Sequence, residues 1–166
     1  MSGIMAAVAG SSKRINYGSG LYLVATGPDV APINASAGYP TVTLVNTWIG
    51  YYRAATTGTY SFGTSTSYSP GFFGGGGYSQ GRIWIGNTAI SGYNDSNYLS
   101  YSNSSYATGN YPVVQGLYYP IRVQWDYSDP YGNFSSYAGS GTLSFYVNGT
   151  NTIGSTIFYN TATNGF

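Results

Sequence analysis

Residues Gly116–Trp125, GLYYPIRVQW, form the most strongly patterned stretch of the chain. From Tyr119 onward, apolar side chains alternate with other residues, which is the period of two that a β-strand requires. The side chains expected on the inner face are Tyr119, Ile121, Val123 and Trp125. Pro120 cannot donate a ladder hydrogen bond, so we expect it at the start of the strand or at a sheet edge. The stretch therefore predicts a strand with one buried face.

A second stretch, Gly81–Asn87 (GRIWIGN), has the same pattern, with Ile83 and Ile85 on one face. Arg82 in this stretch and Arg122 in the first lie opposite the aliphatic side chains. If the two strands pair, both cations share one surface. Each arginine then either extends to solvent along its flexible stem or takes aromatic or carbonyl partners, with Trp84 and Tyr118 as candidates.

The other expected strands alternate in the same way and cover residues 21–25, 41–53, 58–64, 98–102, 141–147 and 153–159. Asn148-Gly149 predicts a tight turn before the last of them. We expect residues 65–81 to form a glycine-rich loop, and residues 94–110 to be mostly irregular. No segment has a helical period. The sequence therefore predicts an all-β fold, a two-sheet antiparallel β-sandwich of jelly-roll type over residues 21–166, preceded by an arm of residues 1–20.

Charge is scarce: 5% of residues are charged and the net charge is +1. Nucleic acid is therefore not an expected partner, because it needs a cluster of cations. The chain has 20 tyrosines and 25 glycines, which favours a neutral surface that is buried at little desolvation cost. Such a surface tends to associate, so we expect contacts with other copies of the chain. No apolar stretch is long enough for membrane insertion.

The arm combines a small apolar patch with two cations, and its assembly contacts are expected at Ile4, Met5, Val8, Lys13 and Arg14. Positive charge follows the apolar run, whereas a signal peptide has it in front. We therefore expect synthesis in a host cytoplasm without secretion by the common route, and a final location in a virus particle, with an extracellular location as the alternative. The arm docks either on its own domain or on a neighbouring subunit.

The chain lacks the commonest catalytic side chains, because it has no histidine, cysteine or glutamate. Asp126 and Asp129 could form a paired-carboxylate site as in a glycosidase. With Asn133 they could also form a weak calcium site. Asp129 precedes Pro130, and this favours a third interpretation, in which the aspartates organise a turn. We therefore expect no enzyme activity and no cofactor, with calcium as a minor alternative.

The glycine-rich loop and its flanks carry four aromatic residues, Tyr68, Phe72, Phe73 and Tyr78. The loop is too rich in glycine for regular structure and too aromatic for a simple linker. It is either a flexible surface hairpin or a loop that presents apolar anchors to a partner or a glycan.

Five segments together resemble a known family: NTWIGYY, TGTYSFGTST, GRIWIG, GLYYPIRVQW and GTLSFYVNG. Their order, over roughly Trp48 to Asn148, is similar to the protective-antigen-type β-sandwich adhesin domain, which includes the flocculin and GLEYA-type lectins. The resemblance implies a sugar site with calcium held by two adjacent aspartates after the GTYSF strand. Here that loop has no carboxylate, so neither the calcium nor the sugar site is carried over. The resemblance also implies a packing or display module, since the family's domain occurs in virion proteins.

These observations predict a non-enzymatic virion structural protein, in a phage capsid decoration or a tail or fibre, whose partners are other copies of itself and virion proteins. One alternative is a carbohydrate-binding adhesin that recognises a host-surface glycan. Another is a self-assembling extracellular filament subunit, in which the arm adds a strand to its neighbour.

Overall fold

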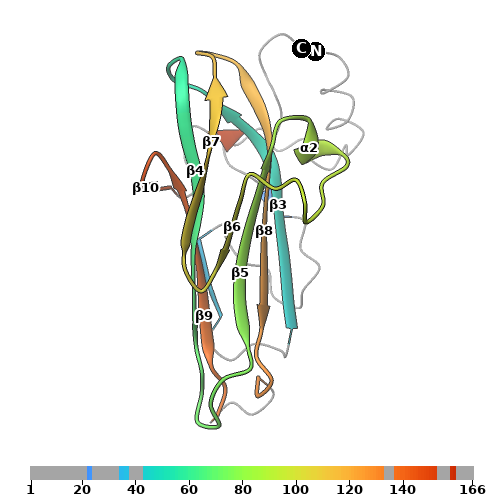
Figure 1. Ribbon diagram of the computed structural model, residues 1–166, viewed down its shortest axis with the longest axis vertical. Helices are drawn as coiled ribbons and strands as arrows, with labels where there is room; N and C mark the ends of the chain where they lie inside the picture. Colours follow the sequence, from blue (N-terminus) through green and yellow to red (C-terminus); the bar gives the residue numbers. More distant parts are fainter. Residues whose placement is uncertain (1–21, 24–33, 38–42, 133–136, 153–157, 160–166) are drawn as a thin grey trace.

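The computed structural model describes residues 22–23, 34–37, 43–132, 137–152 and 158–159 (Figure 1). The described strands are β1 (Tyr22–Leu23), β2 (Ala35–Ala37), β3 (Thr43–Arg53), β4 (Gly58–Ser69), β5 (Tyr78–Ile85), β6 (Ser100–Asn103), β7 (Tyr106–Val113), β8 (Tyr118–Ser128), β9 (Ser140–Val147), β10 (Thr150–Asn151) and β11 (Phe158–Tyr159). One helical turn, α2 (Asn87–Ile90), follows β5. The predicted all-β class is confirmed. The predicted arm, residues 1–20, lies outside the described residues.

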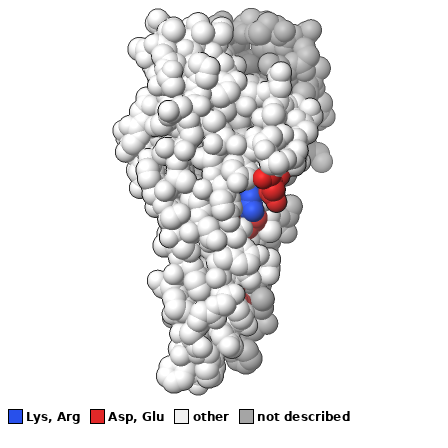
Figure 2. Space-filling view, viewed as in Figure 1, with Lys and Arg blue, Asp and Glu red and all other residues white. Residues whose placement is uncertain are grey.

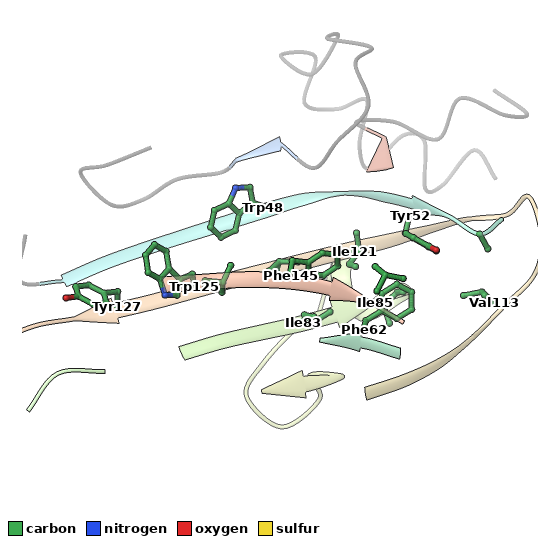
Figure 3. Close-up of a cluster of buried hydrophobic side chains, with 14 of the residues drawn as sticks. Trp48, Tyr52, Phe62, Ile83, Ile85, Val113, Ile121, Trp125, Tyr127 and Phe145 are labelled. Carbon is green, nitrogen blue, oxygen red and sulfur yellow. The ribbon is translucent and has the colours of Figure 1, made fainter. Parts of the chain in front are cut away.

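The described strands pair antiparallel into two sheets. The first sheet has the order β1, β3, β8, β5, β6, and β11 also pairs with β3. The second has the order β10, β9, β4, β7, and β2 also pairs with β9. The two sheets face each other across an apolar core, which confirms the predicted sandwich (Figure 3).

The stretch GLYYPIRVQW leads into and forms most of β8, which lies between β3 and β5 in the first sheet. Its predicted inner face is confirmed, because Ile121, Val123 and Trp125 are at most 1% exposed. Across the core they meet an equally buried set from the second sheet, Phe62, Leu143 and Phe145. Figure 3 shows two of these, Phe62 and Phe145. Pro120 was expected either at the start of its strand or at a sheet edge. It lies near the start of β8, which is an inner strand of the sheet.

The expected loop over residues 65–81 is much shorter in the structure. β4 continues to Ser69 and β5 begins at Tyr78, so only residues 70–77 connect them. The expectation was wrong because small hydroxyl residues conceal the alternation. Thr64 and Thr66 are buried at the inner positions of β4, and their hydroxyls bond to Ser102.

Residues 94–110 also contain more strand than expected. β6 begins two residues later than predicted and ends one residue later, and β7 begins at Tyr106. β7 is an exposed edge strand of mixed polar and aromatic residues, so it lacks the apolar alternation on which the prediction depended. None of the helices in the described residues is long and apolar enough to cross a membrane.

Candidate functional site

The narrow end of the sandwich, at the bottom of Figure 1, carries the turn between β4 and β5. Gly71 and Gly74 form an antiparallel bridge, and the Gly74 N–H donates to the Gly71 carbonyl at 3.1 Å. Phe72 and Phe73 therefore occupy the two central positions of a tight turn. Their side chains are 78% and 55% exposed.

The chain that leaves β8 brings two tyrosines against this turn. The Phe73 ring centroid lies 4.7 Å from that of Tyr137 and 5.2 Å from that of Tyr131. The Phe72 ring lies 5.4 Å from both Phe73 and Tyr137. We call these four residues the aromatic tip. Ring pairs at these separations stabilise each other, so the cluster is pre-formed although it faces solvent.

Glycines permit the close approach of the two loops. A Cβ atom at position 71 would lie 1.7 Å from the carbonyl oxygen of Tyr137, so only glycine fits there. Gly74 has a φ of 93°, a left-handed conformation that glycine adopts without strain. Gly75 is different, because a Cβ there would meet nothing within 4 Å.

Asp129 anchors the loop that carries the tyrosines. It is fully buried, and Oδ1 accepts hydrogen bonds from the Tyr68 hydroxyl at 3.2 Å and from the Tyr131 N–H at 3.1 Å. Oδ2 accepts another from the Gly139 N–H. The carboxylate thus ties the end of β4 to both ends of the loop. Burial, followed by the nearby Asp129 charge, raises the pKa of Tyr68 above its ordinary value.

The surface of the tip is uncharged. Figure 2 shows the charged atoms of this face gathered over its middle, and the narrow end without them. The tip combines ring faces with two phenolic hydroxyls and the peptide groups of a glycine-rich turn. Such a surface suits an uncharged ligand that has both an apolar face and hydrogen-bonding groups.

The charged groups form a separate cluster on the outer face of the first sheet. Arg82 donates to Asp126 at 2.8 Å, and its Nε lies 3.0 Å from the Asp95 carboxylate. Its guanidinium carbon is 4.9 Å from the Tyr101 ring centroid. Burial raises the pKa of Asp126, and the charge of Arg82 partly offsets this effect. Arg82 therefore takes partners and does not extend to solvent, and its charge lies between two carboxylates.

Arg122 also takes partners. It donates to the Ala89 carbonyl at 3.1 Å and lies 3.7 Å from the Tyr93 ring centroid. The chain after α2 covers Trp84, which is 2% exposed and donates to the Asn94 carbonyl and the Asn97 side chain. Trp84 lies on the outer face of β5, on the same side as Arg82, and the following loop buries it there.

Of the predicted contact residues, Phe72 and Phe73 belong to the aromatic tip. Tyr68 is half-buried and supports the tip through Asp129, and Tyr78 begins β5 with 36% exposure. Tyr131 and Tyr137 were missed. The signal that could have found them is topological, because the chain leaving β8 ends where the β4–β5 turn lies.

The structure does not bring Asp126 and Asp129 together as a pair. Asp126 points outward to Arg82, whereas Asp129 is buried among its three donors. The turn interpretation therefore describes Asp129, while Asn133 lies outside the described residues. Within the described ranges, no three His, Cys, Asp or Glu side chains group as metal ligands. The predicted arm contacts Ile4, Met5, Val8, Lys13 and Arg14 also lie outside those ranges.

No family model and no curated protein matches the sequence. Among solved structures, an anti-sigma factor domain-containing protein from Clostridium clariflavum has a TM-score of 0.51 at 14% identity, over 85% of this chain and 47% of that one. The epithelial adhesin 6 A domain from Candida glabrata was solved in complex with Galb1-3GlcNAc. It has a TM-score of 0.48 at 16% identity, and the match covers 86% of this chain and 65% of the adhesin domain. The epithelial adhesin 9 A domain from the same organism has a TM-score of 0.42 at 16% identity, and the match covers 78% of this chain and 61% of that domain.

The chain thus spans less than two thirds of the length of each of these neighbours. At such identities the likeness extends to the fold alone. The predicted fold is supported at that level: the described strands form an antiparallel β-sandwich, and the anti-sigma factor domain-containing protein shares this fold.

Proposed function

We propose that this chain is a non-enzymatic recognition domain that binds an uncharged carbohydrate at the aromatic tip. The observation that carries the proposal is the tip itself, where Phe72, Phe73 and Tyr137 are exposed yet held in mutual ring contact. Large aromatic rings that stay in solvent usually mark a binding surface, because their exposure is otherwise unfavourable.

Two features favour a neutral glycan as the ligand. A sugar ring presents C–H groups on one face, which pack on aromatic rings, and hydroxyls at its edge, which bond to phenols and peptide groups. The tip offers both kinds of contact, and none of its four residues carries a charge that would recognise an ion. Its rings are also positioned before binding, which reduces the entropy lost on association.

The test is a glycan array probed with the labelled full-length chain and two matched double variants. Phe72→Ala/Phe73→Ala removes the exposed rings of the tip. Val114→Ala/Leu117→Ala is the control, because those side chains are 49% and 51% exposed and belong to a different loop. We expect binding to neutral glycans, a loss of at least about tenfold in the tip variant, equivalent to ~1.4 kcal/mol, and no loss in the control. Equal binding by the tip variant, or no binding by any protein, would contradict the proposal.

A virion structural role is the second candidate. What supports it is composition: only 5% of residues are charged, and a neutral surface packs against neighbours at low desolvation cost. In this role the aromatic tip or the arm would be a packing contact. Deleting residues 1–14 separates the two candidates, since glycan binding at the tip should survive the deletion and assembly through the arm should not.

A further inference from the structure

We infer that the free edge of β7 pairs with β7 of a second copy of the chain. β7 is unusual among the described strands of eight or more residues, because each of the others pairs on both sides and β7 pairs only with β4. A long strand with one open side is a template for a further strand.

The hydrogen-bond pattern shows which groups of β7 face outward. The Thr66 N–H donates to the Ser105 carbonyl at 2.9 Å, which fixes the alternation between β4 and β7. The Asn148 N–H donates to the Ser61 carbonyl at 2.9 Å, so the odd-numbered residues of β4 bond to β9 and the even-numbered ones to β7. On β7, positions 107, 109, 111 and 113 therefore bond to β4.

The backbone groups of Tyr106, Thr108, Asn110 and Pro112 consequently point away from the sheet. Within the described part of the chain they have no hydrogen-bond partner. Pro112 has no N–H to offer, and it stands at the end of the strand where it interrupts little. Three consecutive outward positions, 106, 108 and 110, keep both donor and acceptor, which is the pattern an added antiparallel strand requires.

Apart from Pro112 near its end, the edge lacks the usual protection against pairing. Edge strands commonly carry lysine, a bulge or a short length. β7 has eight residues, Tyr106–Val113, with no charged side chain, and its register with β4 is continuous. The outer-face side chains at 106, 108, 110 and 112 are exposed.

The absence of charge favours a second copy as the occupant. When β7 pairs with itself about a two-fold axis at Thr108, the middle of the three outward positions, that residue lies opposite its own copy, so a charge there would repel itself. β7 has none, and antiparallel self-pairing satisfies the donors of both copies in the same way. The resulting dimer joins two sandwiches through one continuous sheet and does not depend on the proposed glycan binding.

The test is the mass of the full-length chain by sedimentation over about 1 µM to about 1 mM, with three variants. Thr108→Pro removes an outward N–H but no bond to β4, and Thr108→Lys places like charges across the dimer axis. Ser144→Lys is the matched control, because it adds the same charge to the outer face of β9, between two paired strands. Far-UV circular dichroism verifies that each variant is folded.

We expect the wild type and Ser144→Lys to reach twice the 17.6 kDa chain mass, and both Thr108 variants to stay at the single mass. Amide exchange gives a readout without substitution: protection of the 106, 108 and 110 N–H groups should rise with protein concentration. A wild type that is monomeric throughout, or Thr108→Lys that dimerises normally, would overturn the inference. Dimerisation that is lost only on deletion of residues 1–14 would also overturn it, and would assign the contact to the arm.

Discussion

The ring of Phe73 lies 4.7 Å from the ring of Tyr137, and this contact joins the β4–β5 turn to the loop that precedes β9. Neither ring is buried in the core. Asp129 supports this contact, because its buried carboxylate accepts a hydrogen bond from the N–H of Gly139, two residues after Tyr137. The structure of the tip therefore depends on residues that would not touch a ligand themselves, and these residues can be tested separately.

Gly71→Ala should disrupt the tip, because its Cβ would lie 1.7 Å from the Tyr137 carbonyl oxygen. We expect a loss of about 1–3 kcal/mol in the free energy of unfolding, the usual cost of overpacking. The measurement is urea unfolding followed by tryptophan fluorescence. Gly75→Ala in the same turn is the control, because a Cβ there meets open space. Equal stability of the two variants would contradict the described contact between the loops.

Asp129→Asn should loosen the loop of Tyr131 and Tyr137. The substitution keeps the shape of the side chain but replaces one acceptor oxygen by an NH2 group. That donor then faces another donor, because all three partners of Asp129 donate to it. We expect about 1–3 kcal/mol of destabilisation, the usual cost of a buried unsatisfied polar group. Ring-to-ring NOEs between Phe73 and Tyr137 should weaken at the same time. If the NOEs keep their intensity, Asp129 does not hold the tip.

Arg82→Met should be much more costly than Asp95→Asn, although both break the same ion pair. The side chain of Asp126 is 19% exposed and would lose its cation, whereas that of Asp95 is 79% exposed. We expect a loss of about 3 kcal/mol for Arg82→Met and under about 1 kcal/mol for Asp95→Asn. Adding Asp126→Asn to Arg82→Met should recover part of the loss. Thermal unfolding of the four proteins measures this, and equal losses in the two single variants would be inconsistent with a partly buried Arg82–Asp126 pair.

Stability should fall in alkali. Burial, followed by the field of Tyr60, raises the pKa of Tyr52 from 10.0 to about 12, and burial and the Asp129 charge raise the pKa of Tyr127. Each folded-state pKa is above the unfolded one, so this contribution is complete below pH ~10 and is lost as pH rises further. Ionisation of each tyrosine in the unfolded state should lower the free energy of unfolding by about 1 kcal/mol between pH 10 and pH 11.

Tyr127→Phe isolates one of these two contributions. Its urea midpoint should decline less than that of the wild type over the same pH interval. Tyr106→Phe, at a 52% exposed ring, should follow the wild-type curve and serves as the control. A wild-type midpoint that does not change between pH 10 and pH 11 would show that the buried phenols do not govern alkaline stability.

The sequence predicted the strands that bury an apolar face. Ile121, Val123 and Trp125, and likewise Leu143 and Phe145, alternate clearly because each faces the core. The Asn148-Gly149 turn was also predictable, because Asn and Gly tolerate positive φ and both residues adopt it here. Thr64 and Thr66 were not readable as inner positions, because buried hydroxyls that bond to Ser102 look like surface residues in the sequence.

Only half of the candidate site was visible before the structure was known. Phe72 and Phe73 stood out as apolar residues among glycines. Tyr131 and Tyr137 are two of 20 tyrosines, and nothing in their neighbours distinguishes them. These tyrosines reach the tip because β4 and β8 end at the same end of the sandwich. This relationship joins residues far apart in the sequence, so no local pattern indicates it.

The proposed binding of an uncharged carbohydrate at the aromatic tip can be observed at the rings themselves. The most direct test is a titration of the full-length chain, labelled with carbon-13 phenylalanine, with the neutral oligosaccharide that gives the strongest array signal. We expect the ring signals of the exposed Phe72 and Phe73 to shift in proportion to occupancy, while those of the buried Phe62 and Phe145 do not. Unchanged Phe72 and Phe73 signals at saturating oligosaccharide would contradict it.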